Sequence, residues 1–305
     1  MKASRGKTRQ HKKEDFLKWL FHKENGHTGF PQDIFTRKAE QLLQEPGVID
    51  ELRKEKLIKR EDHRWILTEK GRKKALNIIR RHRLYEKFLS EKTGIPPEKW
   101  HPLAEKKEHE LSEADWETIE KKLGYPLFDP HGDPIPDKHG HWVEIEAFPL
   151  NEARAGSVVK IVHLEDEPPE IARRIRETGL YHGAVIHIDT VNADKIDYTF
   201  EGTKAAIPVD LAVNIAVQEA DESEWIPGLT RLSTLKKGEE AEIIGLSGRL
   251  RGLLRQRLMD LGFVKGARIR IYMKSPLDEP VAYDIKGSTV ALRKEQADNI
   301  LIRRL

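Results

Sequence analysis

The second half of the chain is a duplication, and this repeat constrains the fold more than any other feature. Three blocks of one copy align with three blocks of the other and stay in register. The aligned blocks are "PLNEARAGSVVKIVHL" with "RLSTLKKGEEAEIIGL" (149–164 and 231–246), "RRIRETGLYHGAVIHI" with "QRLMDLGFVKGARIRI" (173–188 and 256–271), and "YTFEGTKAAIPVDLAVNIAV" with "YDIKGSTVALRKEQADNILI" (198–217 and 283–302). Paired glycines separate short runs of β-branched residues. Each copy is therefore predicted to be a small, half-open β-barrel of about 75 residues with one short helix.

A loop rich in Pro, Gly, Asp and His separates the repeat from the N-terminal part of the chain. It reads "DPHGDPIPDKHGH" from Asp129 to His141, and its prolines prevent a helix from continuing through it. His131 in this loop is either a ligand or general base, or a side chain bonded to a nearby backbone group. A second linker, "ADESEWIPG" (220–228), joins the two copies.

The pattern before this loop is mostly helical. An apolar helix face is predicted in "KKEDFLKWLFHKE" (12–24), and residues 31–56 also have a helical pattern that Pro46-Gly47 interrupts. The segment "KLIKREDHRWILTEKG" (56–71) is typical of two short strands around a polar turn. Helices followed by such a hairpin predict a winged helix-turn-helix.

A helical extension follows the predicted wing. Thr68 has the position of an N-cap for a helix that ends near Gly94. Ser112 and Asp115 have the spacing of a capping box at the start of a later helix, which Gly124 closes.

Composition limits the kinds of site that this chain can build. It has no cysteine, which excludes disulfides, iron–sulfur clusters and thiolate zinc sites. The net charge of +3 says little about a partner. The first thirteen residues, however, hold six Lys/Arg and no acid, which predicts a flexible basic arm for phosphate or anionic lipid, or a solubilising tail. Because no apolar run reaches the length of a membrane span and no signal peptide opens the chain, we expect a cytoplasmic protein, unless the chain is part of something larger.

Histidine and glutamate side chains at helical spacings form a candidate metal site. Two of the donors lie four residues apart on one predicted helix, and four lie on one face of the next, in "WHPLAEKKEHELSE" (100–113). The six donors are His82, Glu86, His101, Glu105, Glu108 and His109. If the two helices pack antiparallel, these donors converge, and a set of imidazoles and carboxylates suits Mn²⁺ or Fe²⁺. The alternative is an ordinary solvated, charged helix.

The same region resembles a known family. "HRLYEKFLSEKTGIPPEKWHPLAEKKEHELSE" followed by "LGYPLFDPHGDPIP" is similar to the metal-dependent repressors of the diphtheria-toxin-repressor family. The resemblance implies a winged helix, a helical dimerisation and metal-binding domain, and a C-terminal SH3-like domain. The tandem barrels resemble that SH3-like module, and the second copy resembles the small ferrous-transport protein FeoA.

The family's ligand pattern falls on the six donors above, and the resemblance adds Asp15 from the first helix. Glu105 stands where the iron-responsive branch has Cys and the manganese-responsive branch has Glu. Lys18 occupies a further ligand position of the manganese branch and cannot bind a metal, so Mn²⁺ and Fe²⁺ both remain open. The acidic turn Glu165-Asp166-Glu167 is a candidate to lend a carboxylate to the site, as SH3-like modules do in the family.

DNA binding is implied by the resemblance, but the residues support it unevenly. The segment at the recognition-helix position, "LLQEPGVIDELRKEKLI" (42–58), opens with an acid and a helix breaker, so base reading is expected to be poor. Phosphate contacts are expected from Arg53, Lys54, Lys56, Lys59 and Arg60. The alternative is that the winged helix has become a packing or dimerisation module.

We therefore predict an α+β multidomain chain. It comprises a winged-helix DNA-binding-like domain (1–70), a helical metal-binding and dimerisation domain (71–140), and two FeoA-like SH3 domains (145–220 and 228–305). The expected function is that of a homodimeric, Mn²⁺- or Fe²⁺-dependent transcriptional regulator that binds operators of metal-uptake genes, and not that of an enzyme. The alternative is a metal-sensing regulatory domain of a metal importer's permease, which acts with a membrane subunit of the transporter and does not bind DNA.

Overall fold

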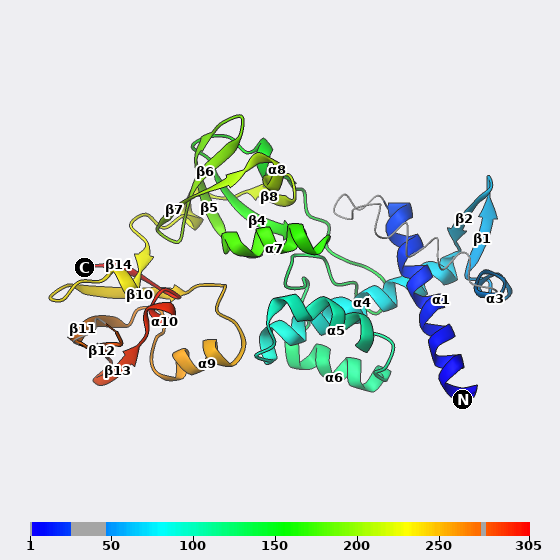
Figure 1. Cartoon of the computed structure of the whole chain (residues 1–305), viewed down its shortest axis with the longest axis horizontal. Coiled ribbons are helices and arrows are strands. Elements are labelled where there is room, and N and C mark those ends of the chain that lie inside the picture. The colour runs from blue at the N-terminus through cyan, green and yellow to red at the C-terminus, as the bar shows by residue number, and fades with distance from the viewer. Residues whose placement is uncertain (1, 26–46, 276–278) are drawn as a thin grey trace. The chain divides into compact units, whose positions relative to one another are not determined.

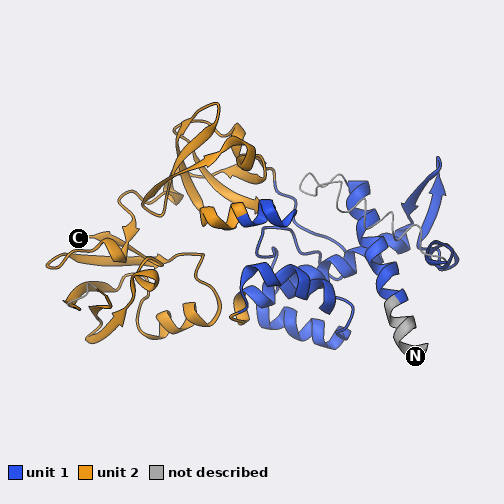
Figure 2. Cartoon of the chain, in the orientation of Figure 1, with its two compact units in different colours: residues 1–90, 95–145, 165–173 blue, residues 91–94, 146–164, 174–305 orange. Residues whose placement is uncertain are grey.

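The computed structural model describes residues 2–25, 47–275 and 279–305. The chain forms two compact units, shown in different colours in Figure 2. The first comprises Met1–Ser90, Ile95–Ile145 and Glu165–Arg173, and the second comprises Glu91–Gly94, Glu146–Leu164 and Arg174–Leu305. The short segment Glu165–Arg173 therefore belongs to the first unit, although the chain on both sides of it belongs to the second.

The first unit begins with helix α1 (Lys2–Asn25), followed by the short helix α3 (Val48–Lys54). Strands β1 (Ile58–Glu61) and β2 (Arg64–Leu67) then form an antiparallel hairpin (Figure 1). Its two turn residues, Asp62 and His63, have positive φ angles of 44° and 63°, which a tight hairpin turn requires. The predicted wing is therefore confirmed.

A hydrophobic core holds this module together. The apolar face of α1 packs against α3, the hairpin and the start of α4. Its fully buried members include Phe16, Leu17, Leu20 and Leu52. The flexible arm predicted for residues 1–13 is wrong from Lys2 onward, because α1 already begins there. Lys, Arg, Gln and Ala have high helix propensities, and the buried face further along α1 anchors the helix. Most of the helix predicted at 31–56 lies outside the described residues.

The helical extension contains α4 (Glu69–Lys92), α5 (Trp100–Lys107) and α6 (Glu113–Leu123). The hydroxyl of Thr68 accepts a hydrogen bond from the Gly71 N–H, as expected of the predicted N-cap. Ser112 and Asp115 form the predicted capping box at the start of α6. Helix α5, however, ends at Lys107, so the predicted continuous helix through residue 113 is not formed.

Two six-stranded antiparallel sheets make up most of the second unit, and each corresponds to one copy of the repeat. The first has the order β3-β8-β4-β5-β6-β7. Its strands are β3 (Phe148–Pro149), β4 (Val158–Leu164), β5 (Val185–Val191), β6 (Lys195–Phe200), β7 (Thr203–Pro208) and β8 (Ile215–Glu219). Two helices, α7 (Pro169–Thr178) and α8 (Val209–Ala212), complete this copy.

The second copy has the order β9-β14-β10-β11-β12-β13 when it is followed from the matching edge. Its strands are β9 (Thr230–Arg231), β10 (Glu240–Leu246), β11 (Arg268–Lys274), β12 (Val281–Ile285), β13 (Ser288–Leu292) and β14 (Ile300–Arg304), and its helices are α9 (Gly252–Asp260) and α10 (Lys294–Ala297). Register shifts fall at equivalent places, at Ile161/His163 in one copy and at Ile243/Gly245 in the other. The duplication read from the sequence therefore extends to strand order and bulges.

Each sheet buries its own apolar core. In the second copy the fully buried residues include Ile243, Phe263 and Ile300. In the first copy Ile161, Ile186 and Val217 are fully buried. Within the described residues, no helix combines the length and apolar character needed to cross a bilayer.

Candidate metal centre

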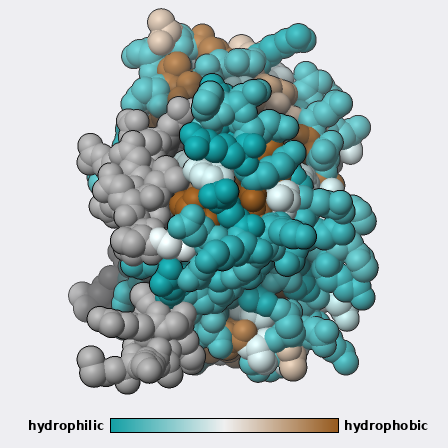
Figure 3. Space-filling view, turned by 90° about the vertical axis from the view of Figure 1, so that its right-hand side faces the viewer, coloured by the Kyte–Doolittle hydropathy of each residue, from teal (hydrophilic) through white to brown (hydrophobic). Residues whose placement is uncertain are grey.

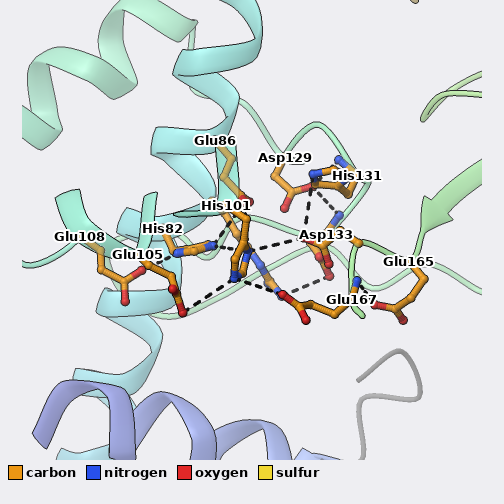
Figure 4. Close-up of polar contacts among 12 residues, drawn as sticks. His82, Glu86, His101, Glu105, Glu108, Asp129, His131, Asp133, Glu165 and Glu167 are labelled. Atoms are coloured by element: carbon orange, nitrogen blue, oxygen red, sulfur yellow. Dashed lines mark hydrogen bonds and ion pairs between the residues drawn. The ribbon is translucent and has the colours of Figure 1, made fainter. Parts of the chain in front are cut away.

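Helix α4 supplies two buried donors of the candidate site. His82 and Glu86 lie one turn apart on it and are 5% and 1% exposed. His101 from α5 faces them, with its Nδ1 atom 3.2 Å from Nε2 of His82 (Figure 4). The Oε1 atom of Glu86 lies 3.4 Å from ring nitrogens of both histidines. We call His82, Glu86 and His101 the inner cluster.

A second group of donors joins α1 to the turn that follows α5. The Nε2 atom of His109 lies 3.1 Å from Oδ1 of Asp15 and 3.4 Å from Oε1 of Glu108. We call Asp15, Glu108 and His109 the outer cluster. On the other side of its ring, Nδ1 of His109 lies 2.6 Å from Oε2 of Glu14. Glu14 was not among the predicted residues, although its position beside Asp15 at the buried face of α1 was visible in the sequence.

The two clusters are linked through one side chain. Nδ1 of His82 lies 2.5 Å from Oε2 of Glu108, while Nε2 of the same ring faces the inner cluster. The ammonium of Lys18 lies 3.2 Å from that same Glu108 oxygen. Glu108 is 1% exposed, so its carboxylate is shielded from water and interacts with other side chains instead.

The six predicted donors therefore do not converge on one point. Because α5 ends at Lys107, His101 remains on the helix while Glu108 and His109 lie beyond its last turn and face α1. Glu105 is at the rim, with its Oε1 atom 3.8 Å from Nε2 of His101 and its side chain 41% exposed. The expectation of a single stripe on one helix is wrong, and two clusters replace it.

A third group of donors, which we call the loop cluster, comprises Glu86, His131 and Asp166. The loop of His131 is held by Asp129, whose Oδ1 atom accepts the backbone N–H groups of His131, Gly132 and Asp133. The inner, outer and loop clusters each have donor atoms within 4.8 Å of one another. The loop cluster was missed as a set, because its members come from three distant segments.

The acidic turn contributes to this region as the sequence suggested. Oδ2 of Asp166 lies 3.7 Å from Nδ1 of His101, and Oε1 of Glu167 lies 3.5 Å from its Nε2. Glu165 instead accepts the backbone N–H of Glu167, which fixes the turn.

Charge is concentrated at these clusters. Burial disfavours the imidazolium of His82, but Glu86 and Glu108 outweigh it and raise its pKa to about 9. Burial likewise opposes the charged form of His109, but its bonds to Asp15 and Glu14 raise the pKa to about 9. Burial by itself would raise the pKa of Glu108. The positive charges of Lys18 and His82 outweigh this effect and lower the pKa to about 2. The carboxylates thus attract positive charge so strongly that protons are retained on the histidines.

The residues fit a divalent metal ion. Oε1 of Glu86 is buried and has no hydrogen-bond partner of ordinary geometry. A buried carboxylate oxygen without a hydrogen bond is costly unless a cation lies beside it, and a bound metal ion would approach it more closely than the rings of His82 and His101 do at 3.4 Å. The donors are imidazole nitrogens and carboxylate oxygens, a set that suits Mn²⁺ and Fe²⁺. Binding an ion here would release protons from the histidines.

The five basic residues predicted to contact DNA lie together in the winged-helix module. Arg53 and Lys54 end α3, Lys56 follows it, and Lys59 and Arg60 lie on β1. All five are exposed. Trp65 on β2 packs beneath the guanidinium groups of Arg53 and Arg60, 5.9 and 5.8 Å from its ring centroid. The face drawn in Figure 3 is mostly hydrophilic, with apolar residues only in small patches.

Comparisons with known proteins agree with this fold. Residues 68–137 match the family model "Iron dependent repressor, metal binding and dimerisation domain", and residues 148–219 and 230–304 each match the FeoA domain. The chain is similar to the Iron-dependent repressor IdeR of Mycobacterium leprae, with 29% identity over 171 residues that cover 50% of this chain and 72% of that protein. A probable metal transport system membrane protein of Chlamydia trachomatis is 34% identical over 85 residues, which cover 28% of this chain and 19% of that protein.

Solved structures extend the comparison over a larger share of the chain. A manganese-dependent transcriptional repressor in complex with manganese aligns with a TM-score of 0.57 and 26% identity, covering 68% of this chain and 99% of that one. These matches define a winged-helix protein with a helical domain and SH3-like barrels. Residues 68–137 thus resemble the metal binding and dimerisation domain of iron-dependent repressors, and two FeoA domains follow them.

Proposed function

We propose that this protein is a Mn²⁺- or Fe²⁺-dependent transcriptional regulator of metal-ion homeostasis. The observation that carries the proposal is the outer cluster, in which Asp15 of α1 meets His109 of the helical domain at 3.1 Å. An ion at this position has one ligand in the module that resembles a DNA-binding domain and two in the domain that binds metal. Capture of the ion is thereby coupled to the orientation of α1.

The proposed ligands are those of the inner and outer clusters. His82, Glu86 and His101 hold an ion in the inner cluster, with Glu105 at its rim and Asp166 nearby. Asp15, Glu108 and His109 hold one in the outer cluster. A bound ion supplies a fixed double positive charge beside His82 and His109, whose pKa values are raised. Glu14 accepts the Nδ1–H of His109 and so presents Nε2 of that ring to Asp15 and Glu108.

The proposed DNA contact is mainly electrostatic. Arg53, Lys54, Lys56, Lys59 and Arg60 reach phosphates, while a homodimer places two winged helices on successive major grooves of an operator of metal-uptake genes. Linkage requires that metal and DNA strengthen each other's binding by equal factors. Such a regulator works in the cytoplasm. We also propose that the domains span residues 1–70, 71–140, 145–220 and 228–305.

A metal-sensing domain of an importer permease is the second candidate. It rests on the similarity to the chlamydial membrane protein, which covers 19% of that protein. The repressor relatives cover a larger share of both chains, so they support the first candidate better. Gel-shift assays on DNA upstream of metal-uptake genes, with and without Mn²⁺ or Fe²⁺, distinguish the two. Metal binding without any DNA shift would favour the importer domain.

The ligand assignment is tested by His101→Ala and His109→Ala in the full chain. Each removes an imidazole from one cluster, so we expect the Mn²⁺ affinity of that cluster to fall by more than about a hundredfold. Titration calorimetry measures the affinity, and far-ultraviolet circular dichroism checks the fold. His141→Ala is the matched control, because His141 is exposed and belongs to none of the three clusters. Wild-type affinity in either variant contradicts the assignment.

A further inference from the structure

Both carboxylate oxygens of Glu108 lie close to nitrogen atoms of other side chains. Its Oε1 atom faces Nε2 of His109 at 3.4 Å, which is the side of the outer cluster. Its Oε2 atom faces Nδ1 of His82 at 2.5 Å and Nζ of Lys18 at 3.2 Å. The carboxylate is thus divided between a face that is open to a metal ion and a face that is taken by two nitrogen donors.

The position of Lys18 on α1 holds its ammonium beside Oε2 of Glu108. Lys18 lies on α1, one turn after Asp15, so both side chains point from the same side of the helix toward Glu108. Its side chain is 12% exposed and that of Glu108 is 1% exposed, so water does not screen the pair effectively. The ammonium therefore places a positive charge 3.2 Å from Oε2 of Glu108, an oxygen that would otherwise be available to bind a metal ion.

Lys18 and His82 together leave no free lone pair on Oε2 of Glu108. A carboxylate has about four lone-pair sites on its two oxygens. Nδ1 of His82 and Nζ of Lys18 both lie within hydrogen-bond distance of Oε2. The ammonium has three donors and no lone pair, so it cannot become a ligand while it is protonated.

We propose that Lys18 acts as a built-in cation that limits the outer cluster to a single metal ion. The proposal rests on the proposed function, since it takes the outer cluster to be a metal site. With Lys18 in place, one divalent ion binds between Asp15, Glu108 and His109, and the ammonium holds the adjacent position on Glu108. Lys18 is therefore a residue that determines metal stoichiometry and not a ligand.

The same contact has a consequence for the metal-free protein. Lys18 joins α1 to the turn after α5 through an ion pair with Glu108 that needs no metal ion. Part of the link between the winged-helix module and the helical domain is thus independent of metal. Because a positive charge stands next to the ion's position, the outer cluster is also expected to bind Mn²⁺ more weakly than it would without Lys18.

Two substitutions test the proposal in the full chain. Lys18→Met removes the charge and keeps the apolar stem, so the Mn²⁺ affinity of the outer cluster should rise at least tenfold with no additional ion. Lys18→Glu puts a carboxylate beside Glu108, so the protein should bind one more Mn²⁺ per chain than wild type. Titration calorimetry gives the affinity and the number of ions. Electron paramagnetic resonance should show more exchange-coupled Mn²⁺ in Lys18→Glu than in wild type.

Matched variants separate this effect from others. Lys23→Glu makes the same charge change on the same helix, where the lysine lies over Trp19, and should leave ion number and affinity unchanged. Adding Asp15→Asn to Lys18→Glu should abolish the extra ion, which locates it at the outer cluster. If Lys18→Glu folds only with metal, a rise in its melting temperature with Mn²⁺ that exceeds that of wild type supports the proposal.

Wild-type ion number and affinity in both Lys18 variants would overturn the inference. That outcome is distinguishable from failure of the proposed function. If His109→Ala leaves Mn²⁺ binding unchanged, the outer cluster is not a metal site and both proposals fail. If His109→Ala loses binding while the Lys18 variants behave like wild type, only the role of Lys18 is wrong.

Discussion

The two copies of the repeat share strand order and bulges, yet the loop after the equivalent strand serves different ends. After β4 the first copy has Glu165-Asp166-Glu167, and Asp166 and Glu167 face His101 in the first unit. After β10 the second copy has Ser247-Gly248-Arg249, and Ser247 donates to Glu201 of the first copy. The same loop thus presents acidic side chains to the candidate metal centre in the first copy. In the second copy it presents a serine that contacts the other barrel.

A second pair of equivalent positions shows the same divergence. Glu201 and Lys286 occupy the same turn in the two copies, with φ angles of 47° and 48°. Glu201 is buried and accepts hydrogen bonds from Tyr181, Arg231 and Ser247, whereas Lys286 is exposed. Duplication therefore preserved the backbone while charge at two turns changed.

The largest effect is expected at the junction between the copies. Glu201→Ala leaves Arg231 without its carboxylate, and this guanidinium is only 12% exposed. Loss of one member of a buried ion pair costs roughly 3–5 kcal/mol, and Arg231 keeps bonds to Asp298 and Thr203, so we expect about 3 kcal/mol. Hydrogen exchange followed by mass spectrometry should show this loss in peptides around residues 228–250.

The equivalent change in the other copy is the control. Lys286→Ala alters the same turn at an exposed position and should change the local free energy of opening by less than about 0.5 kcal/mol. Equal effects of the two substitutions would mean that the turn conformation, and not the buried charge, determines stability. The buried charge of Glu201 would then not account for the difference between the copies.

A smaller effect is expected at Gly248, which is aligned with Asp166. A Cβ atom at Gly248 would lie 2.1 Å from the ring of Tyr181, so a side chain here must displace that ring from Glu201. Gly248→Ala should destabilise the junction by about 1–3 kcal/mol, the usual cost of overpacking. Thermal unfolding followed by circular dichroism measures it.

Gly245→Ala provides the contrast, because nothing lies within 4 Å of a Cβ atom at that position. If both glycine substitutions are tolerated equally, the ring of Tyr181 does not restrict the loop, and the second copy could carry an acidic turn like that of the first.

The contrast between copies also indicates what the sequence can predict. The aligned glycines and β-branched runs were sufficient for two barrels, because backbone turns and strand alternation are local properties. The spacing of His82 and Glu86 likewise placed them on one helix face. The end of α5 at Lys107 was not predictable from spacing, so His101 and His109 were wrongly placed on one stripe. Contacts such as Glu201 with Ser247 depend on how two folded copies pack, which no local pattern encodes.

The smallest effect is expected at the acidic turn. The double substitution Asp166→Asn and Glu167→Gln removes two negative charges 3.7 and 3.5 Å from the ring of His101 but preserves the size of both side chains. Because carboxylates that support metal ligands contribute tenfold or more to affinity, Mn²⁺ binding at the inner cluster should weaken about tenfold. Glu222→Gln with Glu224→Gln is the matched pair, since it removes two exposed charges between the barrels. Titration calorimetry measures the Mn²⁺ affinity of both double variants. A loss of affinity in the first pair alone assigns the acidic turn to the metal centre. Equal affinities of the two double variants would show that the acidic turn does not contribute to metal binding.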